Sequence, residues 1–433
     1  MTDHSMAGGP VSSFWGAVRG HPIRTFAICF VGMIMSTMDQ ALFSYAIPGI
    51  SREFGASLNV MGQILSLSFF VASLSVLVSG VLTDYLGRKR MFVAMMALSA
   101  TFVGCHAFAN SLTMLATFRV IGFALAVGLY PITATIVIEV APARYRGMLS
   151  GWLQLTYPLG FALGAIVASG FLSDFGWRVI FYPAFVVVPL AFILGKLLNE
   201  TKRFEKAQGA ELGAAEAAQS PDRRRLGQHI GELLSPRFRR RSVVCLLGTF
   251  CSNIAIGGMT YFLPSFLAED RGMSEGDAAG LLVWSWGIAA VGYVLASYVG
   301  EFILTRRNTV ILWQWLGALC LALTLWFANS DTMLMIGLGV STMFFFGSEC
   351  VRMPLTGEIF PTRIRATASA ATGALAVTLA SLTAPLIITS AVPILGWTWT
   401  FTFFGVVPLL LAGLIFTQLE NFPSGVEVEE LSR

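Results

Sequence analysis

The stretch EVAPARYR, residues 139–146, has a second copy in EIFPTRIR, residues 358–365. Both follow the pattern Glu-x-x-Pro-x-Arg-x-Arg, and the copies lie 219 residues apart in a chain of 433 residues. Further matches recur at offsets of 218 to 220: Arg88-Lys89 with Arg306-Arg307, Gly176-Trp177 with Gly396-Trp397, Val187-Val188-Pro189 with Val406-Val407-Pro408, and Glu200 with Glu420. A period this long indicates a domain-scale duplication and not a solenoid.

The composition is that of a membrane protein. Hydrophobic residues make up 55% of the chain and charged residues 12%, where soluble domains have roughly 25% charged residues. The mean hydropathy is +0.73. Twelve apolar stretches have about the 20 residues that a spanning helix needs: 24–48, 58–82, 91–109, 112–137, 147–171, 178–198, 242–267, 278–303, 309–328, 332–355, 366–391 and 396–418.

We therefore expect an all-α membrane protein with twelve transmembrane helices in two six-helix halves. The predicted units are an N-terminal half over residues 1–198, a linker over 199–241, and a C-terminal half with a short tail over 242–433. Lys and Arg concentrate in the even-numbered gaps between helices and in the linker, which places the linker and both termini in the cytoplasm. We expect a monomer in the inner (cytoplasmic) membrane, with the lipid bilayer as its surroundings.

Several function classes lack their sequence signatures. There is no phosphate-binding loop, no zinc or disulfide spacing of cysteines and no dinucleotide fingerprint. The net charge of +4 follows from the topology bias and does not indicate nucleic-acid binding. We expect no enzyme activity, no cofactor and no metal, and an ion gradient as the driving force for any uphill movement of substrate.

A motif between the second and third apolar stretches indicates a gate. It reads GVLTDYLGRKR, residues 80–90. Gly80 removes a side chain where helices approach closely, and Gly87 permits a tight turn. Asp84 places an anion at a helix end, where it accepts from basic residues or caps a facing helix. Arg88 can pair with a carboxylate such as Glu139; the alternative is that the basic run only determines topology.

This motif resembles the signature of the major facilitator superfamily, Gly-x-x-x-Asp-x-x-Gly-Arg-Arg/Lys-Arg/Lys. The family also carries Glu-x-x-Pro-x-x-x-Arg-Gly after helices four and ten; here these motifs end in Arg146-Gly147 and Arg365-Ala366. The motif near Arg306 lacks the aspartate and second glycine. The resemblance implies two halves related by a pseudo-two-fold axis along the membrane normal, alternating access, and these gating residues: Gly80, Asp84, Gly87, Arg88, Arg90, Glu139, Arg146, Glu358 and Arg365.

Two charges lie deep in apolar stretches and are functional candidates, because a charge within the bilayer is costly. Asp39 resembles an aspartate of the aromatic-acid/proton symporters and also the aspartate of the Asp-Arg pair in anion/cation symporters. Ser36 and Gln40 depart from those two patterns. A carboxyl group shielded from water can exchange a proton near neutral pH, so Asp39 is the candidate proton carrier. A structural hydrogen bond to another helix is the alternative.

Arg119 is the second deep charge, and it can pair with Asp39 or with a substrate carboxylate. Arg119-Val-Ile-Gly122 with Gly128 resembles the family's helix-four motif. Glu349 and Arg352 stand at i and i+3, so they either form a structural salt bridge or line the cavity. Polar or aromatic substrate-binding candidates complete the set: Gln40, Gln154, Tyr157, Asn253, Tyr261, Trp284 and Trp286. His106 is interpreted as a packing residue.

The resulting hypothesis is proton-coupled uptake of a small organic acid, with aromatic acids among the candidates. Arg119 would bind the carboxylate and Asp39 would carry the proton. One alternative is an exporter of hydrophobic, drug-like compounds, which Gly164-Ala165, in place of that class's Gly-Pro, disfavours. The other alternative is a non-transporting receptor or sensor, which the preserved gate motif disfavours because a sensor need not cycle.

Overall fold

The computed structural model describes residues 19–142, 146–200, 231–361 and 364–421, and all regular structure in these ranges is helical. The first bundle contains α2 (His21–Phe54), α3 (Leu58–Leu86), α4 (Arg88–Cys105), η1 (His106–Phe108), α5 (Leu112–Val140), α6 (Arg146–Leu153), α7 (Thr156–Phe175), η3 (Val179–Phe181) and α8 (Ala184–Leu197). The second contains α11 (Arg239–Thr260), α12 (Leu263–Glu269), α13 (Glu275–Tyr298), η4 (Val299–Ile303), α14 (Arg306–Phe327), α15 (Asp331–Glu358), α16 (Arg365–Ser369), η5 (Ala370–Ala374), α17 (Leu375–Phe401), η6 (Thr402–Val406) and α18 (Val407–Phe416).

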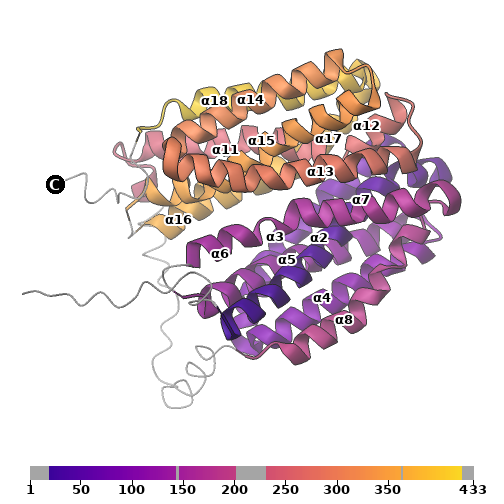
Figure 1. Ribbon diagram of the computed structural model, residues 1–433, viewed down its shortest axis with the longest axis horizontal. Helices are drawn as coiled ribbons and strands as arrows, with labels where there is room; N and C mark the ends of the chain where they lie inside the picture. Colours follow the sequence, from indigo (N-terminus) through magenta and orange to yellow (C-terminus); the bar gives the residue numbers. More distant parts are fainter. Residues whose placement is uncertain (1–18, 143–145, 201–230, 362–363, 422–433) are drawn as a thin grey trace, which may run out of the picture.

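Each group of helices packs mainly within itself. In the N-terminal bundle, α5 packs against α2, α3 and α4, and α4 packs against α8. In the C-terminal bundle, α15 packs against α13 and α14, and α11 packs against α17 and α18. Figure 1 shows the two bundles side by side, the first in indigo to magenta and the second in orange to yellow.

Eleven helical stretches among the described residues are long and apolar enough to cross a membrane. The last of them, Thr367–Phe416, is continuous where two spans were predicted, at 366–391 and 396–418. Within it, Gly396 has non-helical angles, φ 76° and ψ 169°. Two other predicted spans are each interrupted by a turn, so that α6 is separate from α7 and α11 from α12.

Proline and glycine residues account for several helix ends. α5 ends at Val140, just before Pro142, and α15 ends at Glu358, before Pro361, as predicted from the restriction that proline imposes on the preceding residue. α3 ends at Leu86, and the residue that follows, Gly87, has a φ of 95°, which disfavours any residue with a side chain. α4 begins directly after this turn, so the chain reverses within one residue.

The two copies of the repeated Gly-Trp sequence have the same backbone conformation, and we call each of these turns a corner. Gly176 has φ 76° and ψ 179°, and Gly396 has φ 76° and ψ 169°. The indole of Trp177 donates to Glu53 at 2.8 Å, and the indole of Trp397 donates to Glu269 at 3.1 Å. Each tryptophan thus ties a corner to an acid that ends an earlier helix of the same bundle.

The two bundles contact each other at the end of the molecule opposite the linker attachment. There α7 packs against α13, α3 against α17, and α12 against α2. The approach is close, because a methyl group added at Gly276 would clash with Ser173 and one added at Gly62 would clash with Thr389. The exposed side chain of Arg52 forms an ion pair with Glu275 across this contact.

At the linker end, by contrast, glycine residues have open space beside them. A methyl group added at Gly80, at Gly151 or at Gly373 would meet no atom within 4 Å. Gly80 therefore makes no close helix contact among the described residues in this structure, and its role in the gate stays a prediction.

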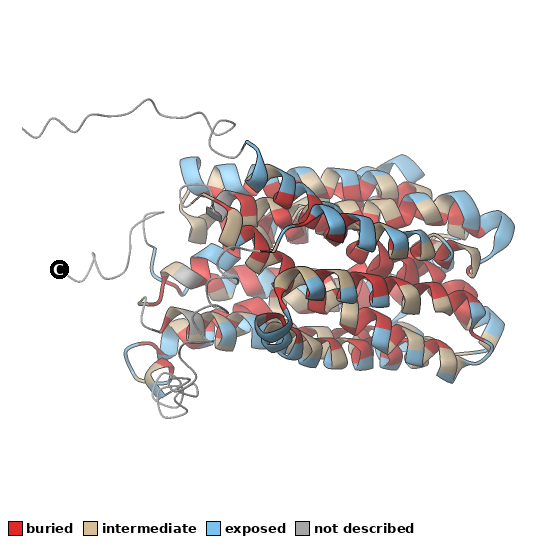
Figure 2. Ribbon diagram, turned by 90° about the horizontal axis from the view of Figure 1, so that it is seen from below, coloured by how far each residue is buried: buried red, intermediate tan, exposed pale blue. Residues whose placement is uncertain are grey.

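The outer surface of the bundles carries large apolar side chains. Leu77, Val186 and Ile394 are 69%, 69% and 81% exposed. Figure 2 shows that buried residues face the spaces between helices, whereas exposed residues lie on the outside. Such a surface is compatible with hydrocarbon and not with water.

Candidate functional site

Arg119, on α5, is a buried cation with unused hydrogen-bonding capacity. Its side chain is 1% exposed, and its guanidinium lies 4.4 Å from the ring centres of both Phe43 and Phe123. Nη1 donates to the Gln40 carbonyl at 3.4 Å, while Nε and Nη2 have no partner among the described residues. Two aromatic faces stabilise the charge, yet two donors are left for an acceptor that the protein does not supply.

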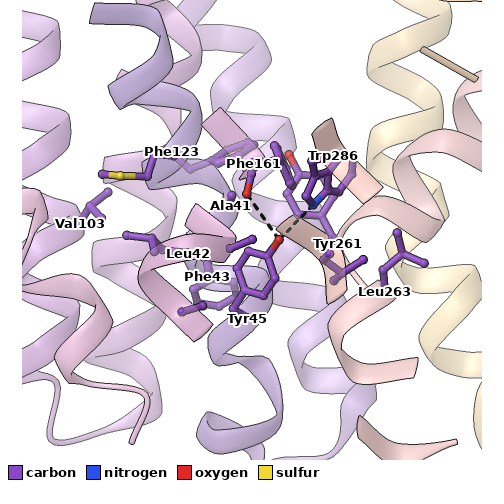
Figure 3. Packing of buried hydrophobic residues seen from close by; sticks show 14 of the residues in the cluster. Ala41, Leu42, Phe43, Tyr45, Val103, Phe123, Phe161, Tyr261, Leu263 and Trp286 are labelled. Atoms are coloured by element: carbon purple, nitrogen blue, oxygen red, sulfur yellow. Dashed lines mark hydrogen bonds between the residues drawn. The ribbon is translucent and has the colours of Figure 1, made fainter. Parts of the chain in front are cut away.

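Aromatic side chains from both bundles surround this region. We call them the aromatic cluster: Phe43, Tyr45, Phe123, Tyr157, Phe161, Tyr261 and Trp286. The ring of Phe161 lies 4.8 Å from Tyr157, 4.9 Å from Trp286 and 5.9 Å from Tyr261. Figure 3 shows most of this cluster where α2, α5 and α7 face the C-terminal bundle.

A hydrogen bond joins the two bundles inside the cluster. The indole N–H of Trp286, on α13, donates to the Tyr45 hydroxyl, on α2, at 3.0 Å. That hydroxyl donates in turn to the Phe161 carbonyl at 3.5 Å (Figure 3). Both Tyr45 and Trp286 are 1% exposed, so this hydrogen bond forms out of contact with water.

Asp39 is buried on α2, next to the residue whose carbonyl accepts from Arg119. It is 2% exposed, and its Oδ1 has no hydrogen-bond partner among the described residues. No ion pair within 4.0 Å joins Asp39 and Arg119 in the described part of the chain. Asp39 is thus adjacent in the chain to a residue that contacts Arg119, but the two side chains do not form an ion pair.

The C-terminal bundle contains the pair predicted on the tenth helix. Arg352 and Glu349 form an ion pair on α15, and Arg352 Nη1 also donates to Thr249 Oγ1 on α11 at 3.1 Å. Ser252 donates to Glu349 at 3.0 Å and accepts from Gln314, on α14, at 2.7 Å. The pair is thus held by side chains of α11, one of which is in turn bonded to α14.

A cavity of about 760 Å³, here called the vestibule, extends from the linker end toward the aromatic cluster. It lies between α5, α6 and the following turn on one side and α13, η4, α14 and α15 on the other. Its lining includes Tyr130, Tyr293 and Cys350. Tyr293 stacks on Phe346 at 6.2 Å, and Phe346 lies 5.3 Å from Tyr157. The vestibule therefore adjoins the cluster through Tyr293 and Phe346.

Charged side chains of the gate motif pair within the N-terminal bundle. Arg88 forms an ion pair with Glu139 at 3.2 Å, with both side chains largely buried. Glu200 accepts from the backbone N–H groups of Arg88 at 3.1 Å and Lys89 at 3.3 Å, which caps the first turn of α4. Arg90 is exposed, and the side chains of Asp84 and Arg146 lie outside the described part of the structure.

The corresponding pair in the C-terminal bundle joins Arg306 to Glu358, and Glu301 also pairs with Arg306 at 2.8 Å. Burial raises the pKa of Glu358, while the neighbouring Arg306 opposes this shift and Glu301 adds to it; Arg365 also acts on Glu358 electrostatically. Both copies of the repeated Glu-x-x-Pro pattern thus contribute an acid to an arginine at the start of another helix.

The remaining sequence candidates occupy different environments. Gln154 lines the vestibule and contacts Met353 Sδ of the other bundle at 3.1 Å, and Gln40 contributes its carbonyl to Arg119. Asn253 donates to the Thr249 carbonyl of its own helix. Trp284 is 67% exposed, so it does not join Trp286 in the cluster: two residues apart on a helix, their side chains point to nearly opposite sides.

His106 packs as expected from the sequence. Its Nδ1 lies 2.9 Å from the Val103 carbonyl, and its ring stacks on Phe181 at 4.8 Å. Sequence reasoning missed Phe43, Tyr45, Phe123 and Phe161. Apolar helices contain many aromatic residues, and only the Tyr45 hydroxyl, six residues after Asp39, was a signal that could have been used.

The comparisons with known proteins agree with this arrangement. The cis,cis-muconate transport protein of Acinetobacter baylyi is 25% identical over 350 residues, covering 79% of this chain and 81% of that protein. The gallate transporter of Pseudomonas putida is 25% identical over 362 residues, covering 78% and 79%. Among solved structures, a D-xylose–proton symporter superimposes with a TM-score of 0.72 at 17% identity, covering 94% of this chain and 100% of that one.

The sequence profile of the Major Facilitator Superfamily matches residues 29–376, which is most of the chain. Together with the helical bundles and the apolar outer surface, this match establishes the fold and the membrane location. The chain is a membrane transport protein of the Major Facilitator Superfamily.

Proposed function

We propose that this protein takes up an aromatic or other small organic acid together with a proton, by alternating access. The observation that carries the proposal is Arg119, a guanidinium held between two phenyl rings with Nε and Nη2 unpaired. A carboxylate accepts well from two guanidinium donors at once. The aromatic cluster beside it offers ring faces and edges to a flat substrate.

The relatives support this substrate class. Their names specify transport of cis,cis-muconate, gallate and 4-hydroxybenzoate, all small carboxylic acids. We extend the class to this chain because its site offers the two groups such acids need, a buried cation and stacking surfaces.

Asp39 is the proposed proton carrier. A buried carboxyl group beside a substrate anion is stabilised by protonation, since two negative charges would otherwise lie close together in a medium of low polarity. Loading the site with one carboxylate and one proton adds no net charge. Arg119 positions the carboxylate, and Asp39 holds the proton until both leave on the same side.

We further propose that the fold comprises twelve spans in two six-helix halves related by a pseudo-two-fold axis. Residues 1–198 and 242–433 are the halves, and 199–241 is a linker in the cytoplasm, as are both termini. Gly396, in the ε region of backbone conformation, supports a division of Thr367–Phe416 into two spans. The contact opposite the linker and the vestibule at the linker end then correspond to an inward-facing state of a monomer.

The gating residues that we propose are Gly80, Asp84, Gly87, Arg88, Arg90, Glu139, Arg146, Glu358 and Arg365.

The test is uptake of labelled 4-hydroxybenzoate, benzoate and nicotinate into proteoliposomes with and without an imposed pH gradient. We expect accumulation that depends on an acidic exterior. Asp39→Asn is expected to lose accumulation while retaining exchange of substrate across the membrane. Arg119→Lys keeps the charge but loses the planar fork, so binding should weaken by about 10-fold or more.

Four results would contradict the proposal. Accumulation that is independent of the gradient would exclude proton coupling, and full accumulation in Asp39→Asn would exclude Asp39 as the carrier. Binding of these acids without any flux would favour a receptor. Expulsion of hydrophobic compounds, with no movement of acids, would favour an exporter.

A further inference from the structure

The buried cations of the two bundles differ in whether they are available to a ligand. Among the described residues, Arg119 and Arg352 are the only arginine or lysine side chains that are buried. Arg352 uses Nε and Nη2 on Glu349 and Nη1 on Thr249. Arg119 has only the Gln40 carbonyl as an acceptor. Of the two buried cations in the described part of the chain, only Arg119 is therefore uncommitted and available to a ligand.

Acidic side chains near the vestibule add to this difference between Arg119 and Arg352. Glu349 is the more accessible member of its pair, with a side chain 19% exposed against 5% for Arg352. It lies close enough to Tyr293, in the wall of the vestibule, to interact with it electrostatically. Arg306, which also lines the vestibule, pairs with both Glu301 and Glu358. Asp39, which precedes the residue whose carbonyl accepts from Arg119, is a further buried carboxyl group in the N-terminal bundle.

A second carboxylate on the substrate would thus be buried without a cation to receive it. An unpaired charge in a poorly hydrated site costs several kcal/mol, which is more than ring contacts recover. We propose that the transport site accepts acids with one carboxylate and excludes acids with two, and that Glu349 contributes to this exclusion. This inference rests on the proposed function and narrows its substrate class, since the relatives include transporters of both mono- and dicarboxylic acids.

The experiment compares ligands of equal shape and different charge. Binding of benzoate, 4-carbamoylbenzoate and terephthalate to the purified full-length protein is measured by isothermal titration calorimetry at pH 7, where every carboxyl group of these ligands is ionised. 4-Carbamoylbenzoate has the size of terephthalate but a single charge. We expect benzoate and 4-carbamoylbenzoate to bind with similar affinity, and terephthalate to bind about 100-fold or more weakly.

The second part of the experiment repeats these binding measurements with the variant Glu349→Gln. This substitution removes the acid from the vestibule side and leaves Arg352 without its counter-ion, so the ratio of terephthalate to 4-carbamoylbenzoate affinity should rise by about 10-fold or more. Asp331→Asn, an exposed acid at the other end of the same helix, is the matched control and should leave the ratio unchanged. Retained binding of benzoate and a single peak in gel filtration show that each variant is folded.

The outcomes separate this inference from the function on which it rests. Equal affinity for terephthalate and 4-carbamoylbenzoate would overturn the inference and leave the proposed function standing. Rejection of both, with benzoate bound, would show selection by size and would also overturn it. An unchanged ratio in Glu349→Gln would remove Glu349 from the explanation. Failure of all three ligands, and of 4-hydroxybenzoate and nicotinate, would refute the proposed function and this inference together.

Discussion

Gly176 and Gly396 lie 220 residues apart in the chain and have the same φ of 76°, with ψ angles of 179° and 169°. This region of backbone conformation is essentially restricted to glycine. A methyl group added at either residue would meet no atom within 4 Å, so any cost of a substitution there is conformational and not steric crowding.

Gly176→Ala and Gly396→Ala should therefore each destabilise the protein by about 1–3 kcal/mol. The measurement is the midpoint of thermal unfolding in detergent. Gly170→Ala is the control, because Gly170 lies in α7 with open space beside it and an ordinary helical conformation. If Gly170→Ala lowered the unfolding midpoint as much as the two variants do, the backbone conformation of Gly176 and Gly396 would not explain their effect.

Glu139→Gln should slow transport more than Glu358→Gln. The Glu139 side chain is 12% exposed and that of Glu358 is 34% exposed, and Arg306 keeps Glu301 as a partner when Glu358 is neutralised. We expect a loss of about 10-fold for the first variant and about 2-fold for the second, in initial uptake rates at pH 7. Equal losses would mean that the C-terminal pair contributes more to the cycle than its exposure indicates.

Glu358 should also give the stability a specific pH dependence. Burial raises its pKa in the folded protein, so the folded state holds this proton more tightly than the unfolded chain does. The stability that protonation contributes is present at low pH and is lost as the pH rises through the raised pKa. The variant Glu358→Gln has no carboxyl group to ionise at this position, so its stability does not fall in this way as the pH rises. Its unfolding midpoint relative to wild type should therefore increase from pH 4 to pH 7, and a decrease would contradict the assignment.

The hydrogen bond between Tyr45 and Trp286 should favour the state in which the bundles meet opposite the linker. A buried neutral hydrogen bond contributes about 0.5–1.5 kcal/mol, so its loss should shift the population of states by about 2- to 10-fold. In Trp286→Phe, a cysteine introduced at Thr389 should react faster with a membrane-impermeant maleimide applied from the side opposite the linker. Thr389 is suited to this because it is 0% exposed and packs against Gly62 at the contact.

Tyr45→Phe should have the same effect, and the double variant should add nothing further. Tyr182→Phe removes a hydroxyl from a side chain that is 44% exposed and serves as the control. Additive effects of the two substitutions would show that they act independently and not through their hydrogen bond.

Sequence reasoning succeeded where a residue is rare in its surroundings. Arg119 and Asp39 were selected because charges seldom occur in the middle of apolar stretches, and both are buried in the structure, while their roles in binding and coupling stay predictions. The ends of α5 and α15 were predicted correctly because Pro142 and Pro361 follow them. The pairing of Arg88 with Glu139 followed from the charge pattern.

Sequence reasoning failed where the choice depends on which side of a helix faces lipid. Trp284 and Trp286 are the same residue type two positions apart, yet one is 67% exposed and the other 1%. Helices that are apolar on every side carry no amphipathic pattern to separate these positions. The same limitation hid Phe43, Phe123 and Phe161, and the open space beside Gly80 depends on the conformation and not on the local sequence.

The ion pairs show what a change between states requires of this molecule. Eight join described side chains, and seven of these connect residues of the same bundle; only the pair of Arg52 and Glu275 crosses between bundles. Arg52 is 72% exposed in that pair, and an exposed pair contributes at most about 1 kcal/mol. The other seven described pairs would stay matched if one bundle turned against the other. Among the described side chains, a relative motion of the two bundles therefore needs the loss of one ion pair, and that pair is an exposed one.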